Sequence, residues 1–245
     1  MKAVRLICTK KTVMLVVVFL ASQNLVAKTL VQKNDRIEID WSNQRVRYFG
    51  QASSENFREA ELAAWQEGAT YLNTALPKRE EKDLLSDVPP KRIAQSSYSY
   101  DTTYFGDGTV KVYLESKMAS LFHQDIAQLR PMTEADSKAK NSALIVRVGT
   151  KATPSALFKI VSGTGQTLYS VENVTKDGFQ KNLMGRWFEA TGGKSYTDFA
   201  GENPVQVDAT VSEPGVFVVS ESMWNEAMTE NPGLLAQAKV AILAE

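Results

Sequence analysis

The feature that most constrains the fold is one long helical segment with strand-like segments on both sides. Residues 55–76 repeat apolar side chains at the spacing of one helical face: Leu62, Trp65, Ala69, Leu72 and Leu76. Ser54 is expected to cap this helix, and Pro77 to end it. The apolar arc covers about half of the circumference and includes small residues such as Gly68. It predicts a helix that lies close against a sheet.

Two strand pairs flank the helix. Before it, residues 36–41 and 45–48 alternate apolar and charged side chains around a polar turn, with acidic residues placed opposite basic ones. After it, residues 98–104 and 110–115 are joined by Gly106-Asp107-Gly108. Strand alternation predicts that Tyr98, Tyr100 and Tyr104 share one face. The order strand, strand, helix, strand, strand predicts a single long helix packed on an antiparallel sheet of two hairpins.

A second module is expected after a polar linker at residues 129–142. Its predicted strands are 143–148, 157–161, 167–171, 216–219 and 240–243, with a helix over 221–229. The Gly-rich stretch 172–204 is expected to be irregular. The sequence therefore predicts an α+β protein with two small modules, residues 33–128 and a smaller mixed unit over 143–245.

The N-terminus has the features of a secretory signal peptide. Basic residues precede an apolar run over 13–21, and Leu25-Val26-Ala27 offers a small residue for cleavage. A membrane-spanning helix needs about 20 apolar residues, and this run is shorter. Residues 1–27 are therefore predicted to be removed on export to the periplasm. No stable membrane insertion is expected afterwards; an anchored or a secreted protein is the alternative.

Charge and residue counts limit the possible functions. The chain has 28 basic and 28 acidic residues, and four of the basic ones lie in residues 1–27, so the exported part carries a formal charge of −4. Such a balance does not favour nucleic acid as a partner. The single cysteine, Cys8, lies in the predicted signal peptide, so the exported chain would contain no cysteine. An exported chain without cysteine is typical of a bacterial periplasmic protein. His123 is the only histidine, so no His or Cys metal site, catalytic triad or cofactor is expected.

One segment resembles a known envelope pattern. Residues 45–52, ending in Gly50-Gln51-Ala52, are followed by an Ala-rich helix through Ala60, Ala64 and Gly68. Over about residues 36–115 the chain resembles the bacterial twenty-kilodalton envelope-lipoprotein family and the similar N-terminal domain of the flagellar T-ring protein. The resemblance implies a periplasmic structural or assembly role and carries over no catalytic residue. The lipidated cysteine of the lipoproteins is absent from this sequence.

These observations favour an exported, non-enzymatic envelope protein that acts as a protein-interaction or assembly module with other envelope proteins. Two alternatives stay open. The first is a wall-active hydrolase that uses two carboxylates, one of them buried. The second is a small-ligand binder that uses the seam between modules or the tyrosine row. Arg186 and Trp187 are the candidate interaction surface, because Arg and Trp are enriched at interface hot spots; the alternative for Trp187 is a place in the core.

Overall fold

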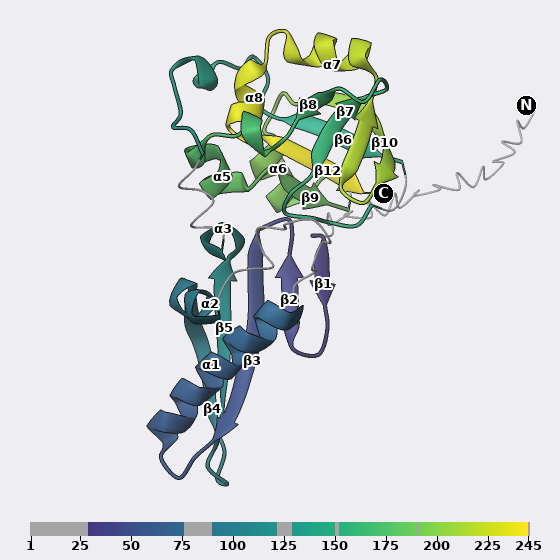
Figure 1. Cartoon of the computed structure of the whole chain (residues 1–245). Coiled ribbons are helices and arrows are strands. Elements are labelled where there is room, and N and C mark those ends of the chain that lie inside the picture. Colours follow the sequence, from purple (N-terminus) through teal and green to yellow (C-terminus); the bar gives the residue numbers. More distant parts are fainter. Residues whose placement is uncertain (1–28, 76–89, 122–128, 150–151, 190, 245) are drawn as a thin grey trace, which may run out of the picture.

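The computed structural model describes residues 29–75, 90–121, 129–149, 152–189 and 191–244 (Figure 1). The predicted signal peptide and His123 lie outside these residues. The described residues form seven α-helices and twelve strands in two sheets, which confirms the α+β class. The strands of one sheet lie between residues 31 and 117 and those of the other between 144 and 244; we refer to the first and the second domain.

The first domain is an antiparallel sheet with one long helix. The sheet order is β1-β2-β3-β5-β4, so both predicted hairpins are present and β1 adds a fifth strand. Its strands are β1 Val31–Lys33, β2 Ile37–Asp40, β3 Arg45–Ser53, β4 Ser97–Tyr104 and β5 Thr109–Lys117. Its helices are α1 Phe57–Ala75, α2 Pro90–Ser96 and α3 Met118–Leu121. Helix α1 lies diagonally across β3 and β5 (Figure 1).

Helix α1 contacts the sheet through its smallest residues. Ala60, Ala64 and Gly68 recur at every fourth position and are buried, and the larger Leu72 continues the same row. At the crossing, a Cβ atom on Gly50 would lie 1.7 Å from the carbonyl oxygen of Ala64, and one on Gly68 would lie 2.8 Å from the Gly50 nitrogen. The backbones of helix and strand are in contact here, so these small residues determine how close α1 lies to the sheet. Leu62, predicted to face the sheet, is 61% exposed instead.

The start of α1 also differs from the prediction. The side chain of Asn56 accepts a hydrogen bond from the Arg58 amide at 3.0 Å, and its carbonyl accepts one from the Ala60 amide. Ser54 Oγ accepts from the Asn56 amide, before the first turn. Asn56 therefore caps the helix, and the expectation of Ser54 was wrong by two residues.

The second domain contains a mixed seven-stranded sheet, so the prediction of a smaller unit was wrong. Its order is β8-β7-β11-β10-β6-β12-β9. The predicted β7–β8 hairpin is present, whereas β9 and β10 were not predicted. The strands are β6 Leu144–Val148, β7 Lys159–Ser162, β8 Thr167–Tyr169, β9 Arg186–Phe188, β10 Val205–Glu213, β11 Val216–Val219 and β12 Val240–Ala244.

The segment expected to be irregular is ordered into helices and a strand. It holds α5 Lys176–Asn182, β9 and α6 Lys194–Ala200. Thr175 caps α5 by accepting from the Gly178 amide at 3.2 Å. Phe199 of α6 packs on Phe188 of β9, with ring centroids 5.9 Å apart. The remaining helices are α7 Glu221–Met228 and α8 Pro232–Ala236, with short 3₁₀ turns at Ala135–Ser137 and Val171–Asn173.

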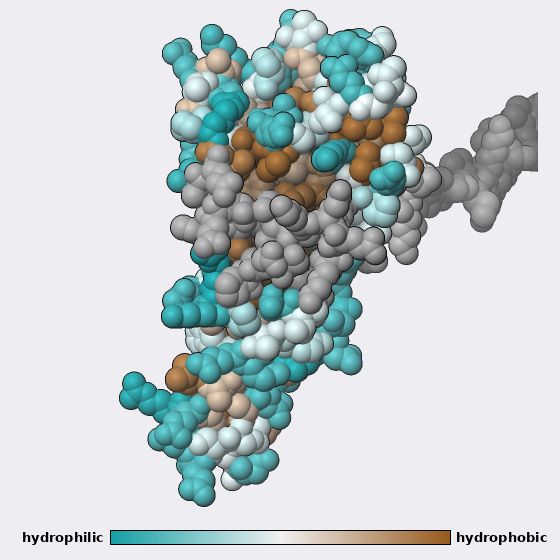
Figure 2. Space-filling view, viewed as in Figure 1, coloured by the Kyte–Doolittle hydropathy of each residue, from teal (hydrophilic) through white to brown (hydrophobic). Residues whose placement is uncertain are grey.

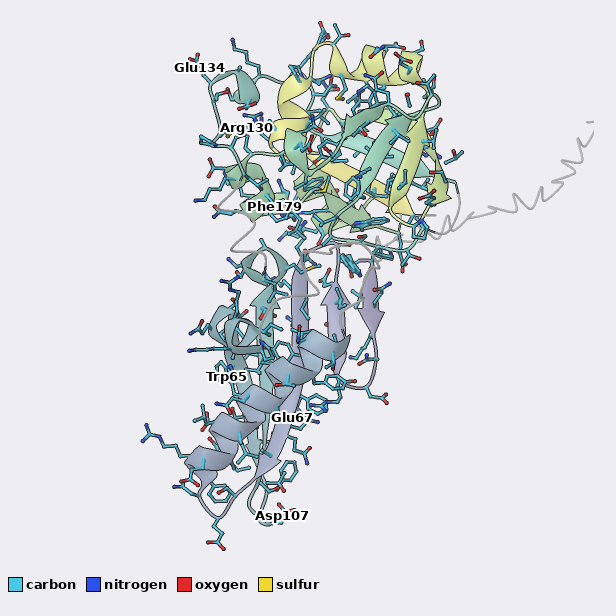
Figure 3. All side chains as sticks on the ribbon, viewed as in Figure 1. Trp65, Glu67, Asp107, Arg130, Glu134 and Phe179 are labelled. Atoms are coloured by element: carbon cyan, nitrogen blue, oxygen red, sulfur yellow. The ribbon has the colours of Figure 1, made fainter. Side chains whose placement is uncertain are left out.

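The linker predicted at residues 129–142 is fastened to the second domain. The Gly233 amide donates to the Lys138 carbonyl at 3.0 Å, and Gln237 Nε2 donates to the Asp136 carbonyl at 2.9 Å. Arg130, labelled in Figure 3, holds the Asp136 carboxylate with two hydrogen bonds of 2.6 and 2.7 Å. This segment therefore belongs to the second domain rather than forming a free tether.

The two domains share one continuous core at their junction. The turn between β2 and β3 enters the second domain, where Ser42 and Gln44 are buried and bond to its backbone. The buried apolar cluster runs without a break from Val46 of the first sheet to Val146 of the second. On the face seen in Figure 2, apolar residues are more visible over the second domain, while the first is mostly polar.

The crossing of α1 over β3 gives the first prediction. Gly50→Ala places a methyl group on the Ala64 carbonyl, so we expect a loss of about 3 kcal/mol or more in the free energy of unfolding, because overpacking against backbone cannot relax cheaply. Gly106→Ala is the matched control, since nothing lies within 4 Å of its added Cβ. Urea unfolding checks both. Equal stability of the two variants would contradict the backbone contact.

Candidate interaction surface

The sheet of the first domain has one face under α1 and one face with exposed side chains. Val46, Tyr48, Val112 and Leu114 are buried on the helix side. The side chains that alternate with them point to the other side. Arg45, Arg47, Tyr98 and Tyr100 are each about half exposed there. We call this side the open face; it is formed by Glu38, Asp40, Arg45, Arg47, Phe49, Tyr98, Tyr100, Lys111, Tyr113 and Glu115.

The open face is organised around one buried carboxylate. Glu115 is 4% exposed. It accepts from Arg47 Nε at 2.7 Å and from the Tyr98 hydroxyl, and Arg45 lies 3.6 Å away. Arg47 also reaches Glu38 across the hairpin at 3.6 Å. The register pairs Glu38 with Arg47 and Asp40 with Arg45, which confirms the predicted opposition of acidic and basic residues.

Its surroundings keep Glu115 ionised. Burial acts to raise the pKa of Glu115, but the hydrogen bonds from Tyr98 and Arg47 and the charges of the two arginines outweigh burial and lower it. A general acid of a two-carboxylate hydrolase needs a raised pKa. The buried acid of the open face has the opposite property, so its surroundings suit a structural ion pair and not acid catalysis.

Aromatic rings form the second component of the open face. Phe49 and Tyr113 lie 5.7 Å apart between ring centroids, and Tyr100 lies 6.1 Å from Tyr113. The Lys111 ammonium is 3.6 Å from the centre of the Phe49 ring, and the Arg47 guanidinium is 5.7 Å from that of Tyr100. These cation–π contacts hold the long side chains against the rings and limit their motion.

The predicted tyrosine row is divided between the two faces. A bulge between Ser99 and Asp101 shifts the pairing of β4 with β5. Tyr98 and Tyr100 stay on the open face, whereas Tyr104 lies on the helix side, where it bonds to Glu61 at 3.1 Å. The expectation of three tyrosines on one face was therefore wrong, because a bulge breaks the alternation of side chains along a strand.

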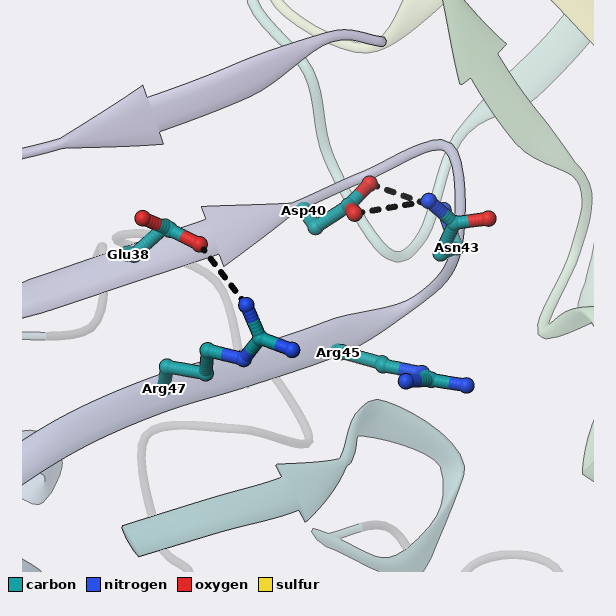
Figure 4. Close-up of a pocket in the computed structure, with 5 residues that line it drawn as sticks. All are labelled: Glu38, Asp40, Asn43, Arg45 and Arg47. Atoms are coloured by element: carbon teal, nitrogen blue, oxygen red, sulfur yellow. Dashed lines mark hydrogen bonds and ion pairs between the residues drawn. The ribbon is translucent and has the colours of Figure 1, made fainter. Parts of the chain in front are cut away.

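A small depression lies on the open face next to the second domain (Figure 4). Its volume is about 130 Å³, and it is lined by Glu38, Asp40, Asn43, Arg45 and Arg47. Asp40 bonds the side chain of Asn43 at 2.7 Å, while Arg47 is directed at Glu38 (Figure 4). Small-molecule sites usually measure about 300–1,000 Å³. The volume of the depression is below that range.

The residues predicted as an interaction surface lie at the domain junction. Trp187 is 1% exposed, and its Nε1 donates to the Ser155 carbonyl at 2.9 Å. A buried tryptophan cannot form an exposed surface, so the prediction for Trp187 was wrong, and its side chain packs in the core instead. Arg186 is partly buried, and its guanidinium lies 5.0 Å from the centre of the Phe199 ring. Burial lowers the pKa of Arg186, and the charge of Asp40 opposes this effect.

Other features of the described residues bear on function. They contain no group of three or more His, Cys, Asp or Glu residues that could hold a metal ion. No helix among them is both long enough and apolar enough to cross a membrane. No protein-family model matches the chain, and no curated protein matches it in sequence.

The ion pairs of Glu115 give a prediction with a pH signature. Glu115→Gln removes the charge that Arg45 and Arg47 neutralise, so we expect the free energy of unfolding to fall by about 1–3 kcal/mol at pH 7. The pKa of Glu115 is lower in the folded protein than in the unfolded chain, so the carboxylate stabilises the fold at any pH above its unfolded-state pKa. This contribution is lost as the pH falls through the folded-state pKa. Urea unfolding between pH 7 and pH 3 should therefore show the difference shrinking.

The control for that experiment is Glu226→Gln on the exposed side of α7. We expect this variant to unfold within about 0.5 kcal/mol of the native protein throughout the same pH range. A difference for Glu115→Gln that stayed constant with pH would show that the lost stability comes from packing and not from the carboxylate charge.

Proposed function

We propose that the protein is an exported, non-enzymatic module of a bacterial envelope that binds another envelope protein through the open face. The observation that carries the proposal is the set of half-exposed Arg and Tyr side chains on a sheet face opposite α1. Arg and Tyr are among the residues that dominate binding energy at protein interfaces. Contacts within the open face also order these side chains in the unbound protein.

The contacts within the open face reduce the cost of binding. Glu115 fixes Arg47 and Tyr98, and the rings of Phe49 and Tyr113 support Lys111. Side chains that are already ordered lose less conformational freedom in a complex, where about 0.5–1.5 kcal/mol is otherwise lost for each immobilised side chain. This arrangement favours recognition of a folded partner surface.

The depression beside Asp40 favours a protein partner over a small ligand. Its small volume suits a single side chain of a partner, and its walls offer both carboxylate acceptors and guanidinium donors. A partner side chain that carries a hydroxyl or an amide can bond to both kinds of group. The predicted signal peptide supports a periplasmic location for such an interaction, and the resemblance to the envelope-lipoprotein family supports an assembly role.

Site-specific photo-cross-linking tests the proposal in the native cell. A photo-reactive phenylalanine analogue replaces Tyr98 or Tyr100, and we expect one discrete cross-linked protein in the periplasmic extract. Adding Arg45→Glu should reduce the cross-link by about tenfold, because it reverses the charge at a half-exposed position of the open face.

Met223 provides the matched control, because it is also large and exposed but lies on α7 of the second domain. The same analogue at Met223 should give no such product. An identical pattern from Met223, or no discrete product from Tyr98 and Tyr100, would contradict binding through the open face.

A further inference from the structure

A second surface of the first domain has an apolar groove that the open face does not include. It lies between α1 and α2, on the helix-covered side of the sheet, and its volume is about 570 Å³. This volume falls within the usual range of about 300–1,000 Å³ for small-molecule sites. Residues 76–89, which join the two helices, lie outside the described part of the chain.

The walls of the groove come from the residues that α1 turns away from the sheet. Leu62 is 61% exposed on one wall, and Trp65, labelled in Figure 3, extends from the same helix. The opposite wall is formed by Pro90 and Ala94 of α2. Trp65 Nε1 donates to the Ala94 carbonyl at 3.2 Å, which satisfies the indole and presents its ring to the groove as an apolar surface.

One positive charge lies among the described residues that line the groove. In the described part of the chain, Lys91 is the one charged residue that lines the groove, and the acidic residues described there do not line it. The other polar lining residues carry amide or hydroxyl groups. An apolar channel with one ammonium group at its wall is complementary to a molecule with an aliphatic chain and a single anionic head.

We propose that the groove between α1 and α2 binds a single-chain anionic amphiphile of the fatty-acid class. The aliphatic chain lies against Leu62 and Trp65, and the carboxylate pairs with Lys91. Burial of the methylenes removes apolar surface from water, so the chain supplies most of the affinity and Lys91 selects the charged head. This site is independent of the open face and of the proposed protein partner.

Tryptophan fluorescence reports on this groove selectively. The sequence has four tryptophans, and Trp41, Trp187 and Trp224 are at most 5% exposed, which leaves Trp65 as the one open to a quencher. In the purified protein, dodecanoate below its micelle concentration should protect Trp65 from acrylamide quenching in a saturable manner. No saturable protection would overturn the proposal.

Three variants resolve the two parts of the interaction. Leu62→Asn should weaken dodecanoate binding by about tenfold, while its exposed position leaves folding intact, which urea unfolding verifies. Lys91→Gln should weaken dodecanoate by about two- to fivefold and leave dodecanol unchanged. Met223→Asn, at an exposed position on α7, should bind as the native protein does. Native affinity in Leu62→Asn, or equal effects of Lys91→Gln on both amphiphiles, would contradict the proposal.

Discussion

The turn between β2 and β3 is the contact on which the arrangement of the two domains depends. Ser42 Oγ donates to the Trp187 carbonyl at 2.6 Å, and Gln44 Nε2 donates to the carbonyls of Asn182 and Gly185 at 2.5 and 3.0 Å. These carbonyls lie where the chain leaves α5 and enters β9. Buried backbone groups need partners, and here the partners come from the other domain. The first domain therefore supplies hydrogen-bond donors to buried backbone carbonyls of the second.

The same hairpin that enters the second domain also carries the open face. Glu38 and Asp40 lie on β2, and Arg45 and Arg47 lie on β3, directly beside the buried turn. Asn43 of the turn bonds to Asp40 at 2.7 Å on one side and to Ser195 of α6 at 3.1 Å on the other. The junction thus fixes one end of the face through hydrogen bonds from both domains. At the other end, α1 holds β3 through Gly50 and Gly68.

Much of the first domain could be predicted from the sequence because its patterns are local. The alternation over 36–48 gives the hairpin and the opposed charges, and the helical spacing gives α1. The residues through which α1 contacts the sheet could not be predicted in the same way, because large apolar residues such as Leu62 dominate a hydrophobic pattern. The real contact is made by Ala and Gly, and it is determined by a strand residue, Gly50, that is distant in sequence. The chain of small residues every fourth position was the available signal.

The second domain was predicted less completely for two physical reasons. Strand β9 has three residues, too few to show a period, and it pairs in parallel with β12, more than fifty residues later. Of the open face, only the tyrosines were singled out from the sequence, because its central residue, Glu115, is an ordinary acid in an alternating strand. Its burial comes from Arg47 and Tyr98 on two other strands. Arg186 and Trp187 drew attention as hot-spot residue types, but residue type alone does not distinguish a surface from a junction.

Amide hydrogen exchange tests most directly whether the two domains form one cooperative unit through this turn. In the native protein, the slowest amides of Val46 and Val112 in the first sheet and of Val146 and Ile242 in the second should share one free energy of opening. In Gln44→Ala, which removes two bonds across the junction, the first domain should open at a lower free energy than the second. Two separate values in the native protein, unchanged in Gln44→Ala, would contradict the account.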